Sequence, residues 1–376
     1  VGLIARLVWR FIALCCVAGA ARAYTDAAGD MGLLHDPGTG ILGSSLPVIL
    51  AREVEELPDF NHRAVLDGLG GYTLGYTRDR RVERLLPNHR LDLATMRATR
   101  FWPREDSLAA HEGIGIDAAA GAIIARLAQN VAGFQAIAPC LMPISGGQDS
   151  RILLGAAREH HARMAGFFGW HMHRQSRRDT ATGARIAERL GLDYTIIARI
   201  EATIDEVAAF YARTGQLATG TALLSLGMVN ALPEGHLVLR GNVLEIARGT
   251  EWGWRKVTRV DPHCARWGMR RLKLSHVAPE ERRPGDLEAR YLAWRDTIPD
   301  AARHVAHDLS FIENYYANAS GARNPAHVNV TLVNAFADRR IIAMTLAVSA
   351  RDRRMGRLNA ALLARAVPDL ADIPFV

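Results

Sequence analysis

The residues best suited to chemistry in this sequence lie in one short segment, Ser-Gly-Gly-Gln-Asp-Ser at positions 145–150. An apolar run at 140–144 precedes it and predicts a buried strand, and a helical pattern begins near Asp149. Glycine lets the backbone approach an anion closely, and the amides at the start of a helix favour negative charge. Ser145 and Ser150 add hydroxyl donors. The segment therefore predicts a loop that binds pyrophosphate, with a plain Gly-Gly turn as the alternative interpretation.

Asp149 carries a negative charge that would repel phosphate if it stood alone, so we expect it to hold Mg²⁺. Magnesium in proteins usually takes one or two carboxylates together with phosphate oxygens. The segment is not a Walker A loop, because no Gly-Lys-Ser/Thr is present. The expected ligands are therefore a nucleotide such as ATP, and Mg²⁺.

Alternating strand and helix signals surround this loop. Apolar runs predict further strands, and helical patterns lie between them, the first with Asp179 as its N-cap and Gly191 as its stop. The strands are expected at 165–170, 194–198 and 237–239, and the helices at 179–190, 204–211 and 222–232. Such units predict an α/β fold, a parallel sheet with helices on both faces. Ligands of these sheets lie at the carboxyl ends of the strands, where the loops at 145–150 and 241–245 both fall.

The region before this pattern has a different character. Residues 1–50 show short β segments separated by turns, and a helical pattern runs from about 107 to 134. The apolar run at 11–17 is flanked by arginines and small residues, which also resembles a secretory signal; we interpret it as a strand because it is short and interrupted. The sequence therefore predicts a β-rich segment at 1–104 and an ATP-binding domain at 105–376.

Residues 143–151, Pro-Ile-Ser-Gly-Gly-Gln-Asp-Ser-Arg, resemble the loop of the asparagine synthetase family. The N-type ATP pyrophosphatase domain of that family also occurs in β-lactam synthetases and lasso-peptide cyclases. Residues 179–192, 336–342 and 368–375 are similar to further family segments, and 26–51 resembles the last strands of its glutaminase domain. The resemblance implies an adenine nucleotide alpha hydrolase-like fold, preceded by a small β-rich remnant of a glutaminase-type domain.

The same resemblance implies particular site residues. Matched to the family, the Mg²⁺ ligands are Asp149 and Glu245, and the ATP-binding residues are Ile144, Ser145, Gly146, Gly147, Asp149, Ser150, Phe168, Arg240 and Gly241. The second loop departs from the family pattern Gly-Glu-Gly-Ala-Asp, because it is Gly-Asn-Val-Leu-Glu at 241–245. Its terminal acid remains, whereas its inner glycine and inner acid are missing.

Two catalytic features of the family are also missing. Its lysine near the C-terminus has no counterpart after Lys273; arginines occupy that stretch, and Arg353 and Arg357 are the expected catalytic residues. Arginine can neutralise pyrophosphate but cannot readily exchange a proton. The cysteine nucleophile of the glutaminase half is absent, so nitrogen would come from free ammonia, an amine of the substrate, or a separate subunit.

The expected function is that of an ATP-dependent amide-forming ligase, which adenylates a small-molecule or peptide carboxylate and releases pyrophosphate and AMP. Two alternatives stay open. One is a catalytically impaired relative that binds nucleotide as a binding or regulatory subunit, and the other is a peptide-macrocyclising ligase like the lasso cyclases.

Composition bears on partners and location. The net charge of +7 comes almost entirely from arginine, since Lys256 and Lys273 are the only lysines, and no nucleic-acid motif accompanies the basic stretch at 255–283. The four cysteines form no disulfide framework, which favours a reducing compartment. We therefore expect a cytoplasmic protein without nucleic-acid or membrane partners.

Overall fold

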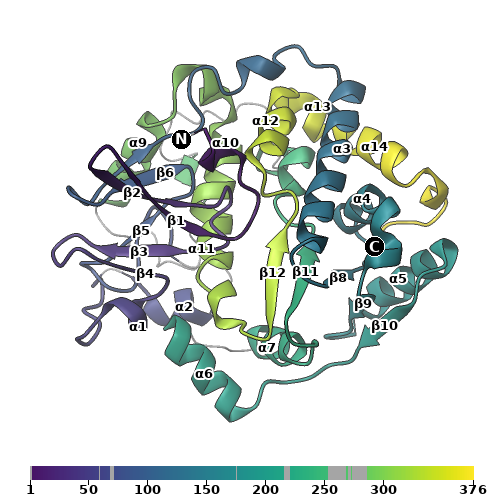
Figure 1. Ribbon diagram of the computed structural model, residues 1–376, viewed down its shortest axis with the longest axis horizontal. Helices are drawn as coiled ribbons and strands as arrows, with labels where there is room; N and C mark the ends of the chain where they lie inside the picture. The colour runs from purple at the N-terminus through teal and green to yellow at the C-terminus, as the bar shows by residue number, and fades with distance from the viewer. Residues whose placement is uncertain are drawn as a thin grey trace. The chain divides into compact units, whose positions relative to one another are not determined.

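The computed structural model describes residues 2–58, 60–67, 72–174, 176–215, 221–252, 268–269, 272 and 286–376. The chain divides into two compact units (Figure 1). The N-terminal unit comprises Val1–Glu112, Ala209–Leu217 and Glu251–Ala326, and the parallel-sheet unit comprises Gly113–Ala208, Ala218–Thr250 and His327–Val376. Cys264, Lys256, Lys273 and nearly all of the basic stretch at 255–283 lie outside the described residues.

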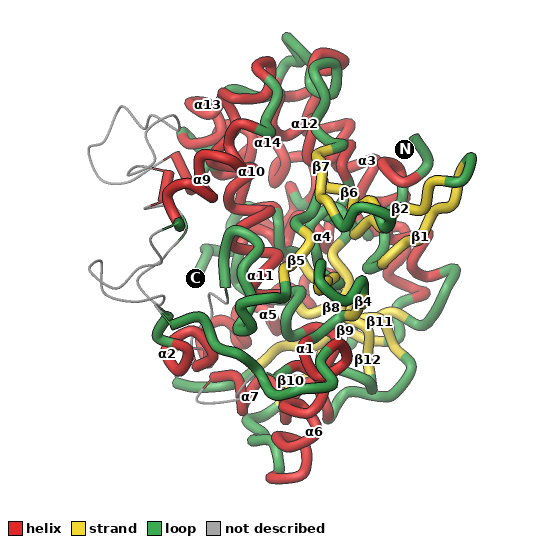
Figure 2. The backbone as a smooth tube through the Cα atoms, turned by 90° about the vertical axis from the view of Figure 1, so that its left-hand side faces the viewer, coloured by secondary structure: helices red, strands yellow, loops and turns green. Residues whose placement is uncertain are grey.

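The parallel-sheet unit is built on five strands. They are β8 (Cys140–Pro143), β9 (Gly166–Trp170), β10 (Tyr194–Ile197), β11 (His236–Arg240) and β12 (Val330–Asn334), in the spatial order β10-β9-β8-β11-β12, with every neighbouring pair parallel. Figure 2 shows β8, β9, β11 and β12 side by side from a second direction. Leu141, Phe168, Val238 and Leu332 meet in one buried cluster, as expected for strands covered by other elements.

Helices flank this sheet. They include α3 (Ile116–Gln135), α4 (Gln148–Ala156), α5 (Ser176–Leu190), α7 (Thr221–Asn230), α12 (Arg339–Ala347), α13 (Ala350–Arg354) and α14 (Arg357–Ala366), whereas α6 (Ile204–Thr214) begins in this unit and ends in the N-terminal unit. The α/β class, the parallel sheet and the four strands predicted from the sequence are confirmed. The strand β12 was not predicted, although it extends the sheet beside β11.

Two predicted helix starts are wrong. The helix expected from about 107 begins at Ile116, because Gly113 has a positive φ of 73° and Gly115 is extended as the N-cap. The helix expected to be capped by Asp179 begins at Ser176, whose hydroxyl accepts a hydrogen bond from the His173 amide at 3.0 Å. Asp179 therefore lies inside the first turn of α5 and is free for another role.

The N-terminal unit contains two antiparallel sheets. One has the order β1 (Ile12–Val17), β2 (Ala20–Thr25), β6 (His89–Asp92), β7 (Arg97–Arg100), and the other the order β4 (Ile41–Gly43), β3 (Leu33–Asp36), β5 (Glu83–Leu85). The run at 11–17 thus forms a strand, as predicted. The helices of this unit include α1 (Leu46–Ile49), α2 (His62–Asp67), α9 (Leu287–Asp296), α10 (Ala306–Ser310) and α11 (Ala317–Ser320).

A buried ionic centre explains why the segment from Glu251 to Ala326 groups with the N-terminal residues. Glu313 is fully buried and accepts two hydrogen bonds from Arg100, at 2.7 and 2.8 Å, and one from Asn88 at 2.9 Å. The Trp294 indole donates to it at 2.7 Å. The boundary expected at 104–105 lies near the first division at Glu112, but the expected continuous domain at 105–376 is interrupted by this segment.

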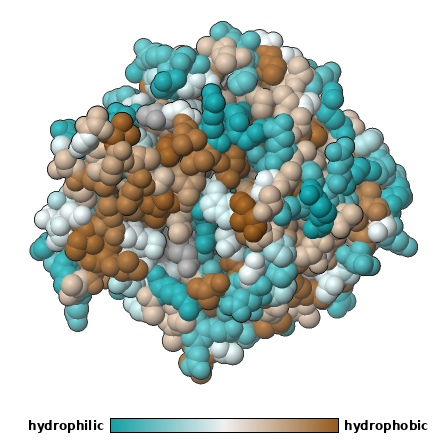
Figure 3. All heavy atoms as spheres, in the orientation of Figure 1, coloured by the Kyte–Doolittle hydropathy of each residue, from teal (hydrophilic) through white to brown (hydrophobic). Residues whose placement is uncertain are grey.

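The surface of the N-terminal unit carries several exposed apolar side chains. Leu14 and Val17 on β1, Ile41 on β4 and Val48 on α1 are all at least 44% exposed. Figure 3 shows apolar side chains gathered on this face of the molecule. None of the helices in the described part of the chain has a stretch both long and apolar enough to cross a membrane.

Candidate functional site

The loop between β8 and α4 is closed by its two serines. The hydroxyls of Ser145 and Ser150 lie 2.7 Å apart, and Ser145 Oγ accepts a hydrogen bond from the Gly147 amide at 3.2 Å. Ser150 Oγ also contacts the carbonyls of Ser145 and Gly147, at 3.2 and 3.3 Å. The serines thus fix the shape of the loop at the carboxyl end of a central strand, where ligands of parallel sheets bind.

The sequence suggested that the two glycine amides face an open anion site. In the structure both amides donate to protein atoms instead. Gly146 donates to Asp179 Oδ1 at 2.7 Å, and Gly147 donates to Ser145. The amides left for an anion are those of the first turn of α4, because the first N–H groups of a helix have no partner within it. These belong to Gln148, Asp149 and Ser150. The helix start, rather than the glycines, therefore carries the positive potential of the loop.

Asp149 is the charged centre of the site. Its Oδ2 accepts a hydrogen bond from Arg248 Nη2 at 2.9 Å, whereas its Oδ1 is buried without a hydrogen-bond partner in the described structure. Burial raises the pKa of Asp149 to about 6; the Arg248 charge acts in the opposite direction, and the Glu245 charge adds to the rise. The carboxylate is thus held in a place that would favour a further cation.

Glu245 comes from the second glycine-bearing loop, which follows β11. Its Oε2 is also buried without a partner among the described residues. A β-carbon on Gly241 would lie 3.2 Å from the Asp149 carbonyl carbon, so this glycine lets the second loop approach the first. Val243 then adopts a left-handed backbone, φ 77°, which is unusual for a β-branched residue. The turn that follows, Leu244–Arg248, carries both Glu245 and Arg248.

The two carboxylates suit a magnesium ion shared with a nucleotide. Within the described residues, no group of three or more His, Cys, Asp or Glu side chains could hold a metal ion by itself. Asp149 and Glu245 each supply one buried oxygen that lacks a hydrogen-bond partner among these residues. Mg²⁺ commonly binds one or two carboxylates and takes its other oxygens from phosphates and water. The donor set therefore fits the ion that the sequence predicted.

The other expected ATP-binding residues lie near the loop but are engaged in the sheet. The amide of Ile144 donates to the Phe168 carbonyl at 2.8 Å. The Phe168 ring packs edge-on against Trp170 in the buried cluster, with ring centres 4.7 Å apart. Arg240 is half-buried at the end of β11. Ile144 and Phe168 are thus part of the sheet and its core, and their side chains are buried.

The two expected catalytic arginines have other partners in this structure. Arg353 is fully buried and donates to the carbonyls of Val348 and Ile246, at 3.0 and 2.6 Å. Since Ile246 belongs to the turn that carries Glu245, Arg353 supports that turn. Arg357 is exposed and pairs with Asp352 at 2.7 Å. Arg248, which pairs with Asp149, was not predicted from the sequence. The one sequence feature that could have indicated it is its position just before Gly249, where the turn Leu244–Arg248 ends.

A cavity of about 360 Å³ adjoins the loop. It is lined by Gln148 and Arg248 on the loop side, by Arg354 and Asn359, and by the apolar Leu363. Asn359 is buried and donates to the Gln148 side chain at 2.5 Å. The cavity thus has room for a small organic molecule directly beside Arg248, the residue that pairs with Asp149.

The C-terminal residues are fastened to the same loop by Arg151. This buried side chain donates to the carbonyls of Ile373 and Pro374, each at 2.6 Å, and to that of Gly146 at 3.1 Å. Its guanidinium lies 4.4 Å from the centre of the Phe375 ring. Figure 1 shows the end of the chain beside α4. Arg151 therefore ties the shape of the loop to the segment that follows α14.

No protein-family model matches the chain, and no curated protein is significantly similar to it. The functional interpretation therefore depends on the site and on the resemblance of its sequence motifs.

Proposed function

We propose that this protein is an ATP-dependent amide-forming ligase of the asparagine synthetase type, with an adenine nucleotide alpha hydrolase-like sheet. One observation carries the proposal. Asp149 and Glu245 come from two loops at the carboxyl ends of the neighbouring strands β8 and β11, and each presents a buried oxygen that has no hydrogen-bond partner in the part of the chain that the structure describes. Residues 1–104 would correspond to the end of a glutaminase-type domain.

Each group of residues at the site would have a separate role in the reaction. Asp149 and Glu245 would hold Mg²⁺, which when bound would offset charge on the phosphates and on departing pyrophosphate. The free amides of Gln148 and Ser150 would bind phosphate oxygens. The cavity lined by Arg354 and Asn359 would accept the carboxylate substrate. Its carboxylate oxygen would attack the α-phosphorus as the bond to pyrophosphate breaks.

Amide formation would complete the reaction. A nitrogen nucleophile would attack the acyl carbon, lose a proton and displace AMP. The nitrogen would come from free ammonia, from an amine of the substrate as in macrocyclisation, or from a separate subunit. We propose a cytoplasmic setting for this chemistry, without nucleic-acid or membrane partners.

Pyrophosphate release tests the proposal. The protein would be incubated with ATP and Mg²⁺ and either aspartate plus ammonia or candidate peptides, and pyrophosphate and AMP would be followed. We expect release that is lost in Asp149→Asn and kept in Asp193→Asn, a control at an exposed acid in the turn between α5 and β10. No release with any tested substrate, or release unchanged in Asp149→Asn, would count against the ligase.

The placement of the arginines favours a second candidate, a nucleotide-binding relative without ligase activity. Arg353 lines the cavity beside the loop but donates to the carbonyls of Val348 and Ile246, and Arg357 pairs with Asp352, so both guanidinium groups are already engaged by the protein. Tight, Mg²⁺-dependent ATP binding without pyrophosphate release in the same experiment would support this candidate over the ligase.

A further inference from the structure

The cavity of about 360 Å³ beside the loop has a positively charged wall. Three arginines line it, Arg248, Arg353 and Arg354, and none of the described residues that line it is Asp or Glu. Arginine is charged at all physiological pH values. The cavity therefore favours an anion over a cation.

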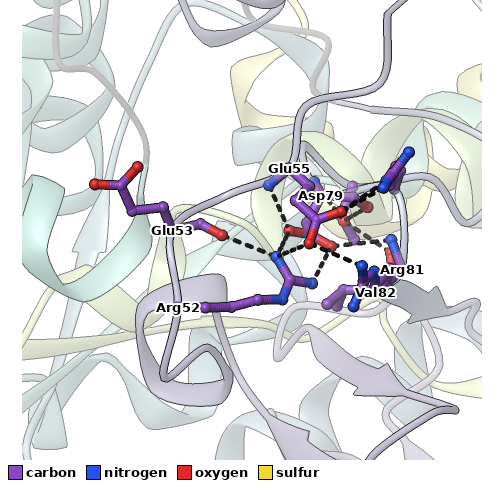
Figure 4. A network of polar contacts seen from close by, with 8 residues as sticks. Arg52, Glu53, Glu55, Asp79, Arg81 and Val82 are labelled. Carbon is purple, nitrogen blue, oxygen red and sulfur yellow. Dashed lines mark hydrogen bonds and ion pairs between the residues drawn. The ribbon is translucent and has the colours of Figure 1, made fainter.

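Arg354 differs from the many arginines of this chain that pair with a carboxylate. In the N-terminal unit, for example, Arg52 makes a two-pronged contact with Asp79, at 2.7 and 2.9 Å (Figure 4). At the cavity itself, Arg248 pairs with Asp149 at 2.9 Å. Arg354 is exposed and makes no ion pair or side-chain hydrogen bond with any described residue. Its guanidinium is therefore available to an anion in the cavity.

The charged groups next to Arg354 on the chain are already engaged. Arg353 is fully buried and donates to backbone carbonyls, so it adds positive potential to the wall without an accessible donor. Asp352 accepts hydrogen bonds from Arg357 and from the Ser349 hydroxyl, both at 2.7 Å. An ammonium group in the cavity would therefore meet arginines and, among the described residues, no carboxylate to pair with.

The rest of the cavity wall includes apolar side chains. Ala360 and Leu363 both line it, and their spacing places them on the same face of α14. Phe375 also lines it and is 49% exposed, while the Arg151 guanidinium lies 4.4 Å from the centre of its ring. Covering these side chains with an apolar body would remove hydrocarbon surface from water, which is favourable.

We propose that this cavity binds a carboxylic acid that has an apolar body and no amino group. Its carboxylate would lie near Arg354, and its hydrocarbon against Leu363 and Phe375. An α-amino acid would have to bring its ammonium group out of water and next to arginines, which is costly without a partner. That this acid is the one adenylated rests on the function proposed above, whereas its binding does not.

Calorimetric titration of matched acids into the full chain tests this assignment. Mg²⁺ and α,β-methylene ATP, which cannot release pyrophosphate, would be present, so that a site completed by a nucleotide is tested as well. The acids 4-methylpentanoate and leucine share one carbon skeleton and differ only in the ammonium group of leucine. We expect 4-methylpentanoate to bind at least about tenfold more tightly than leucine, and about tenfold more tightly than propanoate, whose apolar body is shorter.

Two variants locate the binding site of the acid. Arg354→Met should weaken binding of 4-methylpentanoate about tenfold, whereas Arg351→Met, at an exposed arginine of the same helix that does not line the cavity, should leave it unchanged. Leucine binding as tightly as 4-methylpentanoate, no binding of either acid, or binding unaffected by Arg354→Met would overturn the assignment.

Exchange of labelled pyrophosphate into ATP separates this inference from the proposed ligase activity. Exchange that depends on 4-methylpentanoate would support both. Binding of 4-methylpentanoate with the expected selectivity but without exchange would support the acid site and count against its adenylation.

Discussion

At the scale of single residues, the proposed magnesium site depends on one buried oxygen of Asp149 and one of Glu245, neither of which has a hydrogen-bond partner among the described residues. Arg248 neutralises one edge of Asp149, and the other edge has no protein partner among the described residues. Removing water from such a carboxylate is costly unless a cation or donor replaces it. Neither Asp149 nor Glu245 alone would argue for magnesium, but their convergence from two loops does.

Glu245 can be tested by a conservative pair of substitutions. Glu245→Gln removes the charge with little change in shape, so we expect the Mg²⁺ concentration needed for half-maximal ATP binding to rise about tenfold or more. Glu245→Asp should retain most of the affinity, because the charged oxygens remain. Titration of Mg²⁺ at fixed ATP, followed calorimetrically, measures this. Equal affinity for the Gln variant and the unmodified protein would remove Glu245 from the metal site.

At the scale of elements, the second loop depends on a strained residue. Val243 is buried and has a φ of 77°, at a position where glycine would adopt the same backbone without strain. The buried Arg353 fixes the same loop through its hydrogen bond to the Ile246 carbonyl, and Gly241 allows the loop to lie close to Asp149.

This strain predicts an inverted order of stability between two variants. Val243→Ala loses buried methyl groups and keeps the strain, so we expect it to cost about 2 kcal/mol of unfolding free energy. Val243→Gly loses slightly more side chain but relieves about 1–2 kcal/mol of strain. Denaturant unfolding should therefore find the Gly variant at least as stable as the Ala variant. A Gly variant less stable than Ala by 1 kcal/mol or more would contradict the described backbone.

The hydrogen bonds of Arg151 between the loop and the C-terminal residues lead to a second prediction at the scale of elements. Arg151→Met leaves the carbonyls of Ile373 and Pro374 without this donor and leaves that of Gly146 with only the Val376 amide, so we expect a loss of about 2–4 kcal/mol and faster proteolysis after residue 370. Arg158→Met is the matched control, because it removes only an exposed ion pair with Asp369 and should cost less than about 1 kcal/mol. Equal effects of the two substitutions would show that the buried contacts do not hold the tail.

Four of the five strands of the parallel sheet could be predicted from the sequence, because each is a short apolar run; β12 was not predicted. The loop at 145–150 could be predicted because it follows such a run and contains two glycines. The start of α5 could not, because Asp179 pairs with Gly146 rather than capping its own helix. Arg248 could not be assigned to Asp149 either, since the pair depends on the path of a loop 99 residues further along the chain.

At the scale of the whole molecule, the division into two units depends on long-range polar contacts. Glu313 unites residues from β7, α9 and the turn before β6 in one buried centre. These contacts join positions more than 200 residues apart, as in the pairs of Glu313 with Asn88 and Arg100. No local pattern predicts such partners, so the interruption of the expected domain at 105–376 could not be read from the sequence.

His89 makes the stability of the molecule depend on pH. Burial and the Arg100 charge lower its pKa to about 4, and its Nδ1 donates to the Pro87 carbonyl at 3.0 Å. His89 binds a proton near pH 6.5 in the unfolded chain and only near pH 4 in the folded chain. The contribution of neutral His89 to the free energy of unfolding is therefore complete above pH 6.5 and is lost as pH falls toward 4. The loss from this one group would reach about 3 kcal/mol.

The substitution His89→Asn isolates the effect of His89 on the pH dependence of stability, because Asn keeps a donor toward Pro87 but does not titrate. We expect the difference in unfolding free energy between the two proteins to be constant above pH 6.5 and to shift in favour of the Asn variant as pH falls. Denaturant unfolding at several pH values measures it. A difference independent of pH between 4 and 7 would show that His89 titrates normally.

The central claim is that the loop at the start of α4, with Asp149 and Glu245, holds Mg²⁺ and the phosphates of a nucleotide. Calorimetric titration of ATP into the full chain, with Mg²⁺ and then with EDTA, tests it most directly. The account predicts binding in Mg²⁺ that is lost in EDTA and in Asp149→Asn, while Asp193→Asn binds normally. ATP binding that is unchanged by Asp149→Asn, or no binding of ATP by the unmodified protein, would contradict it.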